Sequence, residues 1–270
     1  MENENKPELL TIELAPDVRM EFVTVPAGKF IMGSDKNKDE DAREDELPQH
    51  TVTLAAFWIG KYPVTNLQYQ VFVQAKGVNA PKDWQDGQFP DGKEDHPVSN
   101  VSWEEAEAFC QWATGLLQAG PSASLAKDVR MPTEAEWEKA ARGTDGRLYP
   151  WGNRHPDDTL CNFTEIIKDT TPVGKYSPQG DSPYGCVDIA GNVWEWTADY
   201  HSADYYQKSP KNNPHGPDTG MSRVVRGGAM NSLDILVRCA ARSRFRHTLR
   251  YRNIGFRCAA SCVIRRPQKA

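Results

Sequence analysis

Asp188-Ile-Ala-Gly-Asn-Val-Trp-Glu-Trp196 is the stretch of this sequence that says most about the fold. Its adjacent glycine and asparagine favour a tight turn. The simplest interpretation is that Asn192 and Glu195 cap the turn while Trp194 and Trp196 pack into a core. The rest of the chain has the same character, since 8 Trp, 20 Gly and 19 Pro imply many turns between short elements, with bulky side chains anchoring the loops.

Three capping boxes upstream of this stretch predict three helices. In each box a Ser or Thr side chain accepts from a backbone N–H three residues later, where a Glu or Gln side chain reaches back. No long helical period follows residue 147, so the second half should consist of irregular loops and short strands. The expected helices begin after Thr65, Ser102 and Thr133. They end at Gly77, near Gly115 or slightly beyond it, and at Gly143.

The chain has no fixed-period repeat and no low-complexity linker, which predicts one α+β domain over residues 20–262. We interpret residues 1–19 as a loose extension and residues 263–270 as a basic tail. Within the domain, residues 20–34 predict a bent hairpin and residues 51–62 a further strand.

Charge is divided unevenly along the chain. The net charge is -5, yet residues 221–270 hold 12 basic residues against the single acid Asp234. The body is therefore acidic, and we interpret its acid-rich segment, residues 35–46, as a solvated loop without chemistry. Seven arginines lie within residues 238–257. We expect about half of them to pair with internal acids and expect no nucleic-acid partner, because no nucleic-acid-binding motif accompanies them.

The sequence does not support membrane insertion or export. The longest apolar run, residues 55–60, is far below the ~20 residues of a membrane span, so we expect no membrane insertion. The first ten residues are acidic and polar, unlike a secretory signal, which predicts a cytoplasmic protein. Six cysteines without a CxxC spacing argue against a disulfide scaffold and a structural zinc site.

Seven runs spaced along the chain carry a resemblance to one family. They stand in the order found in formylglycine-generating enzymes, the sulfatase-modifying-factor family, and the resemblance covers about residues 20 to 260. It implies a fold with little regular secondary structure that is related to C-type lectin-like domains. The runs are Val25-Pro-Ala-Gly-Lys-Phe-Ile-Met-Gly-Ser34, Pro97-Val-Ser-Asn-Val-Ser-Trp103, Arg130-Met-Pro-Thr-Glu-Ala-Glu-Trp-Glu138, Tyr149-Pro-Trp-Gly152, Gly191-Asn-Val-Trp-Glu-Trp196, Arg226-Gly-Gly228 and Ile254-Gly-Phe-Arg-Cys258.

The resemblance implies oxidation of a sulfatase cysteine to formylglycine, with copper held by two cysteines spaced C-x4-C shortly after a Gly-Gly pair. Here Ser232 occupies the first cysteine position, counted from the Gly-Gly pair, and Asp234 the second, counted back from Cys239. A hydroxyl and a carboxylate do not supply the soft thiolate ligands that Cu(I) selects. We therefore expect no copper, no catalytic residues and no formylglycine generation.

The resemblance also implies a structural calcium site in the opening stretch. Its ligands would be the side chains of Asp188 and Glu195 and the backbone carbonyls of Gly191 and Val193, a set of oxygens that suits Ca²⁺. The alternative is the capped turn described above. A second family site would begin at Asn162, although its later carboxylate does not align.

The resemblance makes Cys110 and Cys258 neighbours, because some secreted relatives form a disulfide at these positions. In a reducing compartment we expect two buried thiols in contact instead. Cys239 matches the other bridging position, but its partner position is Ala141, so its thiol should be buried and inert.

These observations predict a non-catalytic domain that binds a protein or small-molecule ligand through the 229–252 segment beside a Trp-rich floor. One alternative is an oxidoreductase of the same family that uses other ligands. Another is a variable ligand-binding protein of a diversity-generating retroelement, in which this segment would be diversified. The expected ligand-binding residues are Asn231, Ser232, Asp234, Arg242, Arg246 and Trp196.

Overall fold

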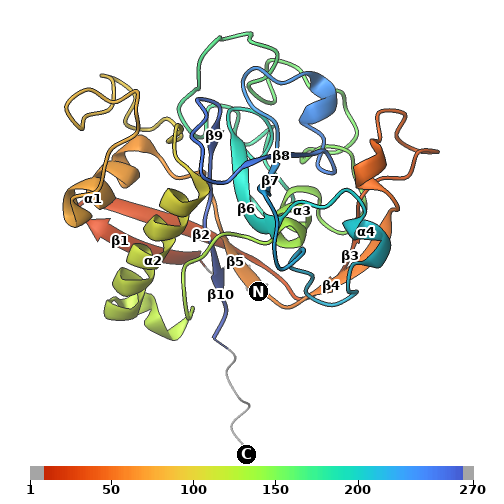
Figure 1. The fold of residues 1–270 in the computed structure, drawn as a ribbon, viewed down its shortest axis with the longest axis horizontal. Helices are drawn as coiled ribbons and strands as arrows, with labels where there is room; N and C mark the ends of the chain where they lie inside the picture. The colour runs from red at the N-terminus through yellow and green to blue at the C-terminus, as the bar shows by residue number, and fades with distance from the viewer. Residues whose placement is uncertain (1–8, 264–270) are drawn as a thin grey trace, which may run out of the picture.

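Two four-stranded sheets, a two-stranded ladder and three main helices organise residues 9–263, the part of the chain that the computed structural model describes (Figure 1). Long irregular segments connect them, above all between residues 143 and 193. The architecture confirms the predicted α+β domain with little regular secondary structure in its second half.

The first sheet joins the two ends of the described chain. Its antiparallel β1–β2 hairpin pairs Leu9 with Val23 and Ala15 with Val18. The prediction of a loose extension over residues 1–19 is therefore wrong for residues 9–19, because alternate β1 side chains are buried in the core. Residues 1–8, and residues 264–270 of the predicted tail, lie outside the described residues. In sheet order the strands are β1 (Leu9–Ala15), β2 (Val18–Val25), β5 (Phe57–Gly60) and β10 (Ala259–Ser261).

A separate ladder pairs β3 (Gly28–Met32) with β4 (His50–Leu54). The predicted hairpin over residues 20–34 is wrong, because β2 and β3 belong to different sheets. The chain bends between them, and the predicted strand at residues 51–62 divides in the same way into β4 and β5.

The three predicted helices are α1 (Asn66–Lys76), α2 (Trp103–Ala119) and α3 (Glu134–Arg142), and each begins with its predicted capping box. α1 and α2 pack against β1, on the left in Figure 1. α2 ends at Ala119, which agrees with the expected end near Gly115 or slightly beyond it. The buried positions of α2 run on past Gly115 to Leu117, and packing there outweighs the weak helix propensity of glycine.

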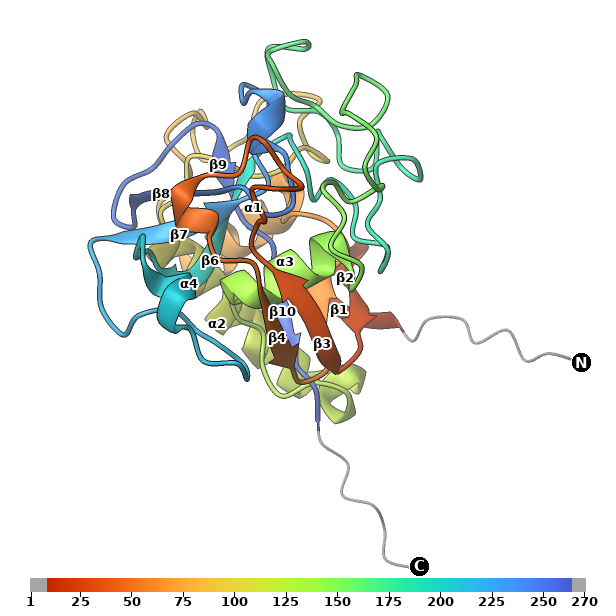
Figure 2. The same cartoon turned by 90° about the vertical axis from the view of Figure 1, so that its right-hand side faces the viewer.

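The second four-stranded sheet has the order β8 (Arg242–Arg246), β7 (Ser222–Arg226), β6 (Trp194–Tyr200) and β9 (Ile254–Gly255). α3 lies between this sheet and the β3–β4 ladder and contacts both, as Figure 2 shows from the side. The short helical turns are η1 (Glu44–Glu46), η2 (Pro121–Ser124), α4 (Tyr205–Lys208) and η3 (Asp234–Leu236).

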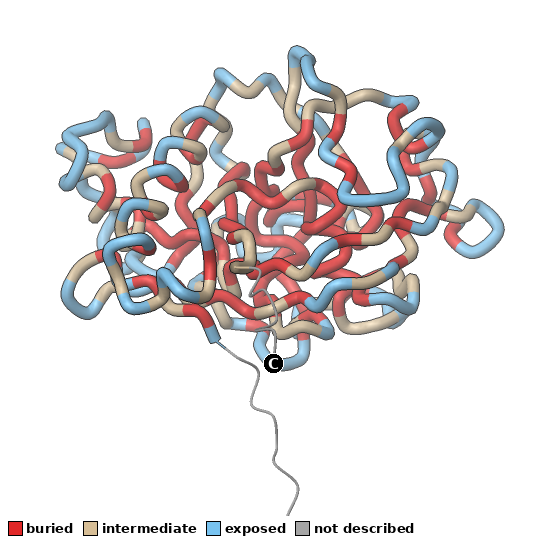
Figure 3. The backbone as a smooth tube through the Cα atoms, turned by 90° about the horizontal axis from the view of Figure 1, so that it is seen from below, coloured by how far each residue is buried: buried red, intermediate tan, exposed pale blue. Residues whose placement is uncertain are grey.

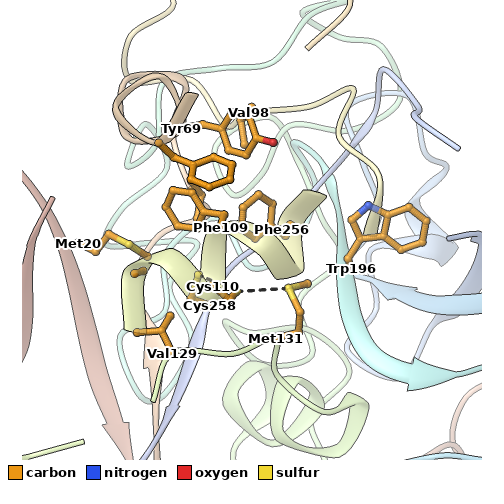
Figure 4. Packing of buried hydrophobic residues seen from close by; sticks show 14 of the residues in the cluster. Met20, Tyr69, Val98, Phe109, Cys110, Val129, Met131, Trp196, Phe256 and Cys258 are labelled. Atoms are coloured by element: carbon orange, nitrogen blue, oxygen red, sulfur yellow. Dashed lines mark hydrogen bonds between the residues drawn. The ribbon is translucent and has the colours of Figure 1, made fainter. Parts of the chain in front are cut away.

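The core lies where these sheets and helices meet, while the exposed residues follow the peripheral loops (Figure 3). In Figure 4, Cys110 of α2 lies beside Cys258, with their Sγ atoms 3.6 Å apart, and Met131 contacts Cys110. Both thiols are fully buried, which confirms the predicted pair of thiols in contact. None of the helices within residues 9–263 has the length and apolar character of a bilayer span.

Candidate functional site

Two acids of α3 form the centre of a buried charge network. Glu134 and Glu138 lie one helical turn apart and therefore on the same face of the helix. Arg226 of β7 donates to Glu134 at 3.1 Å and to Glu138 at 2.5 Å, and Arg242 of β8 holds Glu134 through two bonds of 2.8 Å. Burial acts to raise the pKa of Glu138, but Arg226 and Arg142 lower it below its ordinary value. Through these ion pairs the two acids lock α3 to the sheet.

Arg238 makes a second buried junction, between η3 and the acid-rich segment of residues 35–46. Its Nη1 lies 2.6 Å from Asp39 Oδ2, and its Nη2 lies 2.9 Å from Glu46 Oε1. All three side chains are buried. The prediction that residues 35–46 form a solvated loop is therefore wrong at Asp39 and Glu46, which compensate an arginine nearly 200 positions further along the chain.

Four of the seven arginines within residues 238–257 take part in internal ion pairs. Besides Arg238 and Arg242, these are Arg250 with Glu105 and Arg257 with Glu195. The expectation that about half pair internally is confirmed. The remaining three, Arg244, Arg246 and Arg252, are exposed on the surface.

Three of the six expected ligand-binding residues are buried. Trp196 is completely buried and donates through Nε1 to the carbonyl of Val101 at 3.1 Å. Arg242 is held by Glu134, and Ser232 is 4% exposed. These three side chains are buried beneath the surface of the 229–252 segment, out of reach of a ligand in this structure.

Asn231, Asp234 and Arg246 are the expected ligand-binding residues that reach the surface. Asn231 accepts from Asn253 at 3.1 Å, and Asp234 lies 3.1 Å from His155 Nε2. The histidine comes from the loop after Tyr149, whose ring stacks on Trp151. Only the fold brings His155 to Asp234, because the two residues lie in distant segments of the chain.

The two positions expected to hold copper ligands have local structural roles. Ser232 Oγ accepts from the backbone N–H of Ala229 at 2.9 Å, which closes a tight turn. Asp234 accepts from the N–H of Ile235 at 2.8 Å at the start of η3. Neither position offers a thiolate, and the hydroxyl of Ser232 is already committed to the backbone.

The predicted calcium ligands Asp188 and Glu195 lie in different environments. Both oxygens of Glu195 accept from Arg257, at 2.7 Å each, and Oε2 also accepts from Trp137 Nε1 at 2.6 Å. Arg257 thus already neutralises Glu195, which argues against Glu195 as a metal ligand. Asp188 accepts from the N–H of Gly174 at 2.6 Å, and burial raises its pKa to about 6.

Asn162 fits a cation better than Glu195 does. Its Oδ1 is buried and has no hydrogen-bond partner among the described residues. Its backbone packs closely on Gly191, where φ is +75° and a Cβ atom would lie 2.4 Å from the Asn162 carbonyl oxygen. The side-chain amide of the adjacent Asn192 accepts from the backbone N–H of Thr171 and donates to its carbonyl, which joins the loops that contain these two residues. The interpretation of Asn192 as a turn cap did not reveal this contact. An orphaned buried carbonyl oxygen of this kind suits Ca²⁺.

The loops around Asp188 and Asn162 do not bring together a cluster of acidic, histidine or cysteine side chains. Within residues 9–263, no three such side chains converge in a way that would bind a metal ion. Any calcium would therefore depend on backbone and amide oxygens in addition to Asp188.

Asp199 of β6 is a buried acid beside the start of α3. It accepts from the N–H of Glu134 at 2.8 Å. Burial, followed by the charge of Glu134, raises the pKa of Asp199 to about 8. The sequence places Asp199 close to the tryptophans, but only the tertiary packing brings it to the start of α3.

The structure is an α+β domain with a loop-rich second half, in which Arg226 and Arg242 hold α3 against the second sheet. Residues 12–262 match the family described as sulfatase-modifying factor enzyme 1-like domain. The chain belongs to this family. The formylglycine-generating enzyme of Streptomyces coelicolor is 35% identical over 88% of this chain and 88% of its own length.

Two solved structures share the fold over almost the whole chain. PvdO from Pseudomonas aeruginosa is 25% identical with a TM-score of 0.77, covering 95% of this chain and 99% of its own. Treponema denticola variable protein 1 is also 25% identical, with a TM-score of 0.76 and coverage of 94% and 99%. The family therefore includes proteins whose names differ from those of formylglycine-generating enzymes.

Proposed function

We propose that this chain is a non-catalytic binding domain of the formylglycine-generating enzyme-like family, which recognises a protein or small-molecule ligand through exposed residues of the 229–252 segment. The observation that carries the proposal is the replacement of the expected thiol pair by Ser232 and Asp234. Fold similarity does not transmit a reaction when the reacting groups differ. The buried ion pairs of Arg238 and Arg242 hold the segment rigidly, as a binding surface requires.

Copper binding and peptide oxidation test this proposal together. The chain should bind no stoichiometric Cu(I) and convert no cysteine-containing sulfatase peptide, while a formylglycine-generating enzyme assayed in parallel does both. The matched variant Ser232→Cys/Asp234→Cys restores two thiols and should gain Cu(I) affinity. Tight Cu(I) binding or peptide turnover by the unaltered chain would contradict the proposal and favour the oxidoreductase alternative.

The likeness to variable protein 1 supports a second candidate, in which residues 229–253 are diversified. The stretch from Asn231 to Asn253 contains no Lys, Gln, Glu, Met or Trp, residues that mutation of asparagine codons does not produce. Sequencing the gene from many isolates tests this candidate. Substitutions should cluster within the segment, and an even distribution along the chain would refute it.

We also propose a structural calcium ion at the loops around Asp188 and Asn162, with the carbonyls of Gly191 and Val193 as further oxygens. The unpartnered Asn162 Oδ1 and the buried carboxylate of Asp188 support this site. Glu195 is better explained as the partner of Arg257.

A further inference from the structure

A cleft of about 520 Å³ lies where β8 meets η1 and α4, outside the loops where the family's cysteine pair would stand. Figure 2 shows β8, α4 and the orange turn of η1 on the same side of the molecule. The residues that line the cleft are Arg43, Glu44, Asp45, Ala203, Asp204, Gln207, Arg242, Ser243 and Arg244.

β8 is an edge strand, and β7 is its sheet neighbour. An edge strand directs alternate N–H and C=O groups outward, where an extended peptide can pair with them. The register pairs Arg242 with Arg226 and Arg244 with Val224, so these two of the three β8 arginines project from the face that covers α3. Arg242 is buried against Glu134, whereas Arg244 is exposed at the cleft.

The three acids of the cleft are already compensated. Each carboxylate lies within ion-pair distance of a lysine or a histidine side chain. They therefore contribute little uncompensated negative charge. The pairs are Glu44 with Lys36, Asp204 with Lys208 at 2.6 Å, and Asp45 with His201 at 3.3 Å.

Arg43 and Arg244 are different. Within residues 9–263 neither guanidinium forms a hydrogen bond or an ion pair, and both are exposed. Arg43 acts on Asp45 only at longer range: burial acts to raise the pKa of Asp45, but His201, Arg242 and Arg43 lower it. Two arginines thus reach the cleft with donors free for a carboxylate.

We propose that an extended acidic peptide segment of a partner protein binds in this cleft, adding a strand to the free edge of β8 and placing its carboxylates on Arg43 and Arg244. The inference rests on the proposed binding function and specifies its partner. Arg242 supports the floor through Glu134 and does not contact the peptide.

The same charges argue for a peptide rather than a nucleic acid. A phosphate backbone carries a regular series of negative charges and requires a continuous basic path. Among the described residues that line the cleft, Arg43 and Arg244 are the unpaired basic side chains, and two separate guanidiniums do not form such a path. Carboxylates on alternate peptide residues would reach the two arginines while the intervening residues face away.

The test is fluorescence anisotropy with a labelled peptide of alternating Glu and Val. The unaltered chain should bind this peptide, and Arg43→Ala or Arg244→Ala should weaken binding by about tenfold or more, the loss expected for a charge-assisted hydrogen bond. Arg252→Ala is the matched control, since Arg252 is exposed but does not line the cleft. A Gln-for-Glu peptide and a peptide N-methylated on alternate residues should both bind at least tenfold more weakly.

Equal binding by the Arg244→Ala variant, or by the Gln peptide, would overturn the charge contacts and the proposal with them. Equal binding by the N-methylated peptide would overturn strand addition, and tighter binding of a single-stranded oligonucleotide than of the acidic peptide would overturn the choice of partner. Absence of peptide binding together with absence of copper and turnover refutes this inference alone. Peptide turnover instead refutes the proposed function.

Discussion

Replacing Arg238 with methionine should destabilise the protein severely, because it leaves Asp39 and Glu46 without their cation. Both carboxylates are buried, and the guanidinium makes three bonds of 2.6 to 3.0 Å to them. Removing one partner of a buried ion pair costs about 3 to 5 kcal/mol. At roughly 2 to 4 °C per kcal/mol for a chain of this size, Tm should fall by about 6 to 20 °C. Methionine keeps an apolar stem in place, so the loss reports mainly the charge.

Urea unfolding followed by tryptophan fluorescence measures this loss. The matched control is Arg252→Met at an exposed position, which should change the free energy of unfolding by no more than about 0.5 kcal/mol. The destabilisation should also shrink as pH falls, since an unpaired buried carboxylate can take up a proton and become neutral. A loss below about 1 kcal/mol, or one equal to that of the control, would refute the view that Arg238 joins these loops electrostatically.

Burial and Glu134 raise the pKa of Asp199 to about 8, so the folded state holds a proton that the unfolded state releases near its ordinary pKa of 3.8. Stability from Asp199 is therefore full below about pH 4 and declines up to about pH 8; Asp199→Asn should flatten this part of the Tm–pH curve, and parallel curves would contradict the assignment. EDTA should lower Tm of the unaltered chain but not of Asp188→Ala, and an unchanged melting curve in EDTA would remove the calcium proposal. Burial raises the pKa of Cys239 to about 12, so this thiol, like that of Cys110, should react with a disulfide reagent only after unfolding; mass spectrometry of native protein showing rapid labelling at either cysteine would contradict their burial.

The helix starts were predicted correctly because their signals are local. A capping box at Thr65, Ser102 or Thr133 needs only residues three positions apart, and all three form as expected. The end of α2 was not predictable in the same way, because the packing of its buried face decides whether the helix continues past Gly115. The expected contact between Cys110 and Cys258 came from the family resemblance and not from local physics.

For the candidate site, too, residue identities follow from the sequence, whereas burial follows from the tertiary structure. The sequence shows Ser232 and Asp234 where the family resemblance implies a thiol pair, because chemical identity needs no coordinates. It did not show that Trp196 and Arg242 are buried, since aromatic and arginine side chains serve equally well in cores and on binding surfaces. Burial is decided by what packs on top of a residue.

Charge pairing depended most on the tertiary structure. The sequence shows an acidic body followed by an arginine-rich segment. From this charge balance we predicted that about half of the arginines pair with internal acids. Which acids do so was decided only by the fold, which brings Asp39 and Glu46 to Arg238. Within residues 9–263, the fold leaves the guanidiniums of Arg43 and Arg244 unpaired at the cleft beside β8. The physical reason is that a buried charge requires a partner within a few ångströms in space, whatever their separation along the chain.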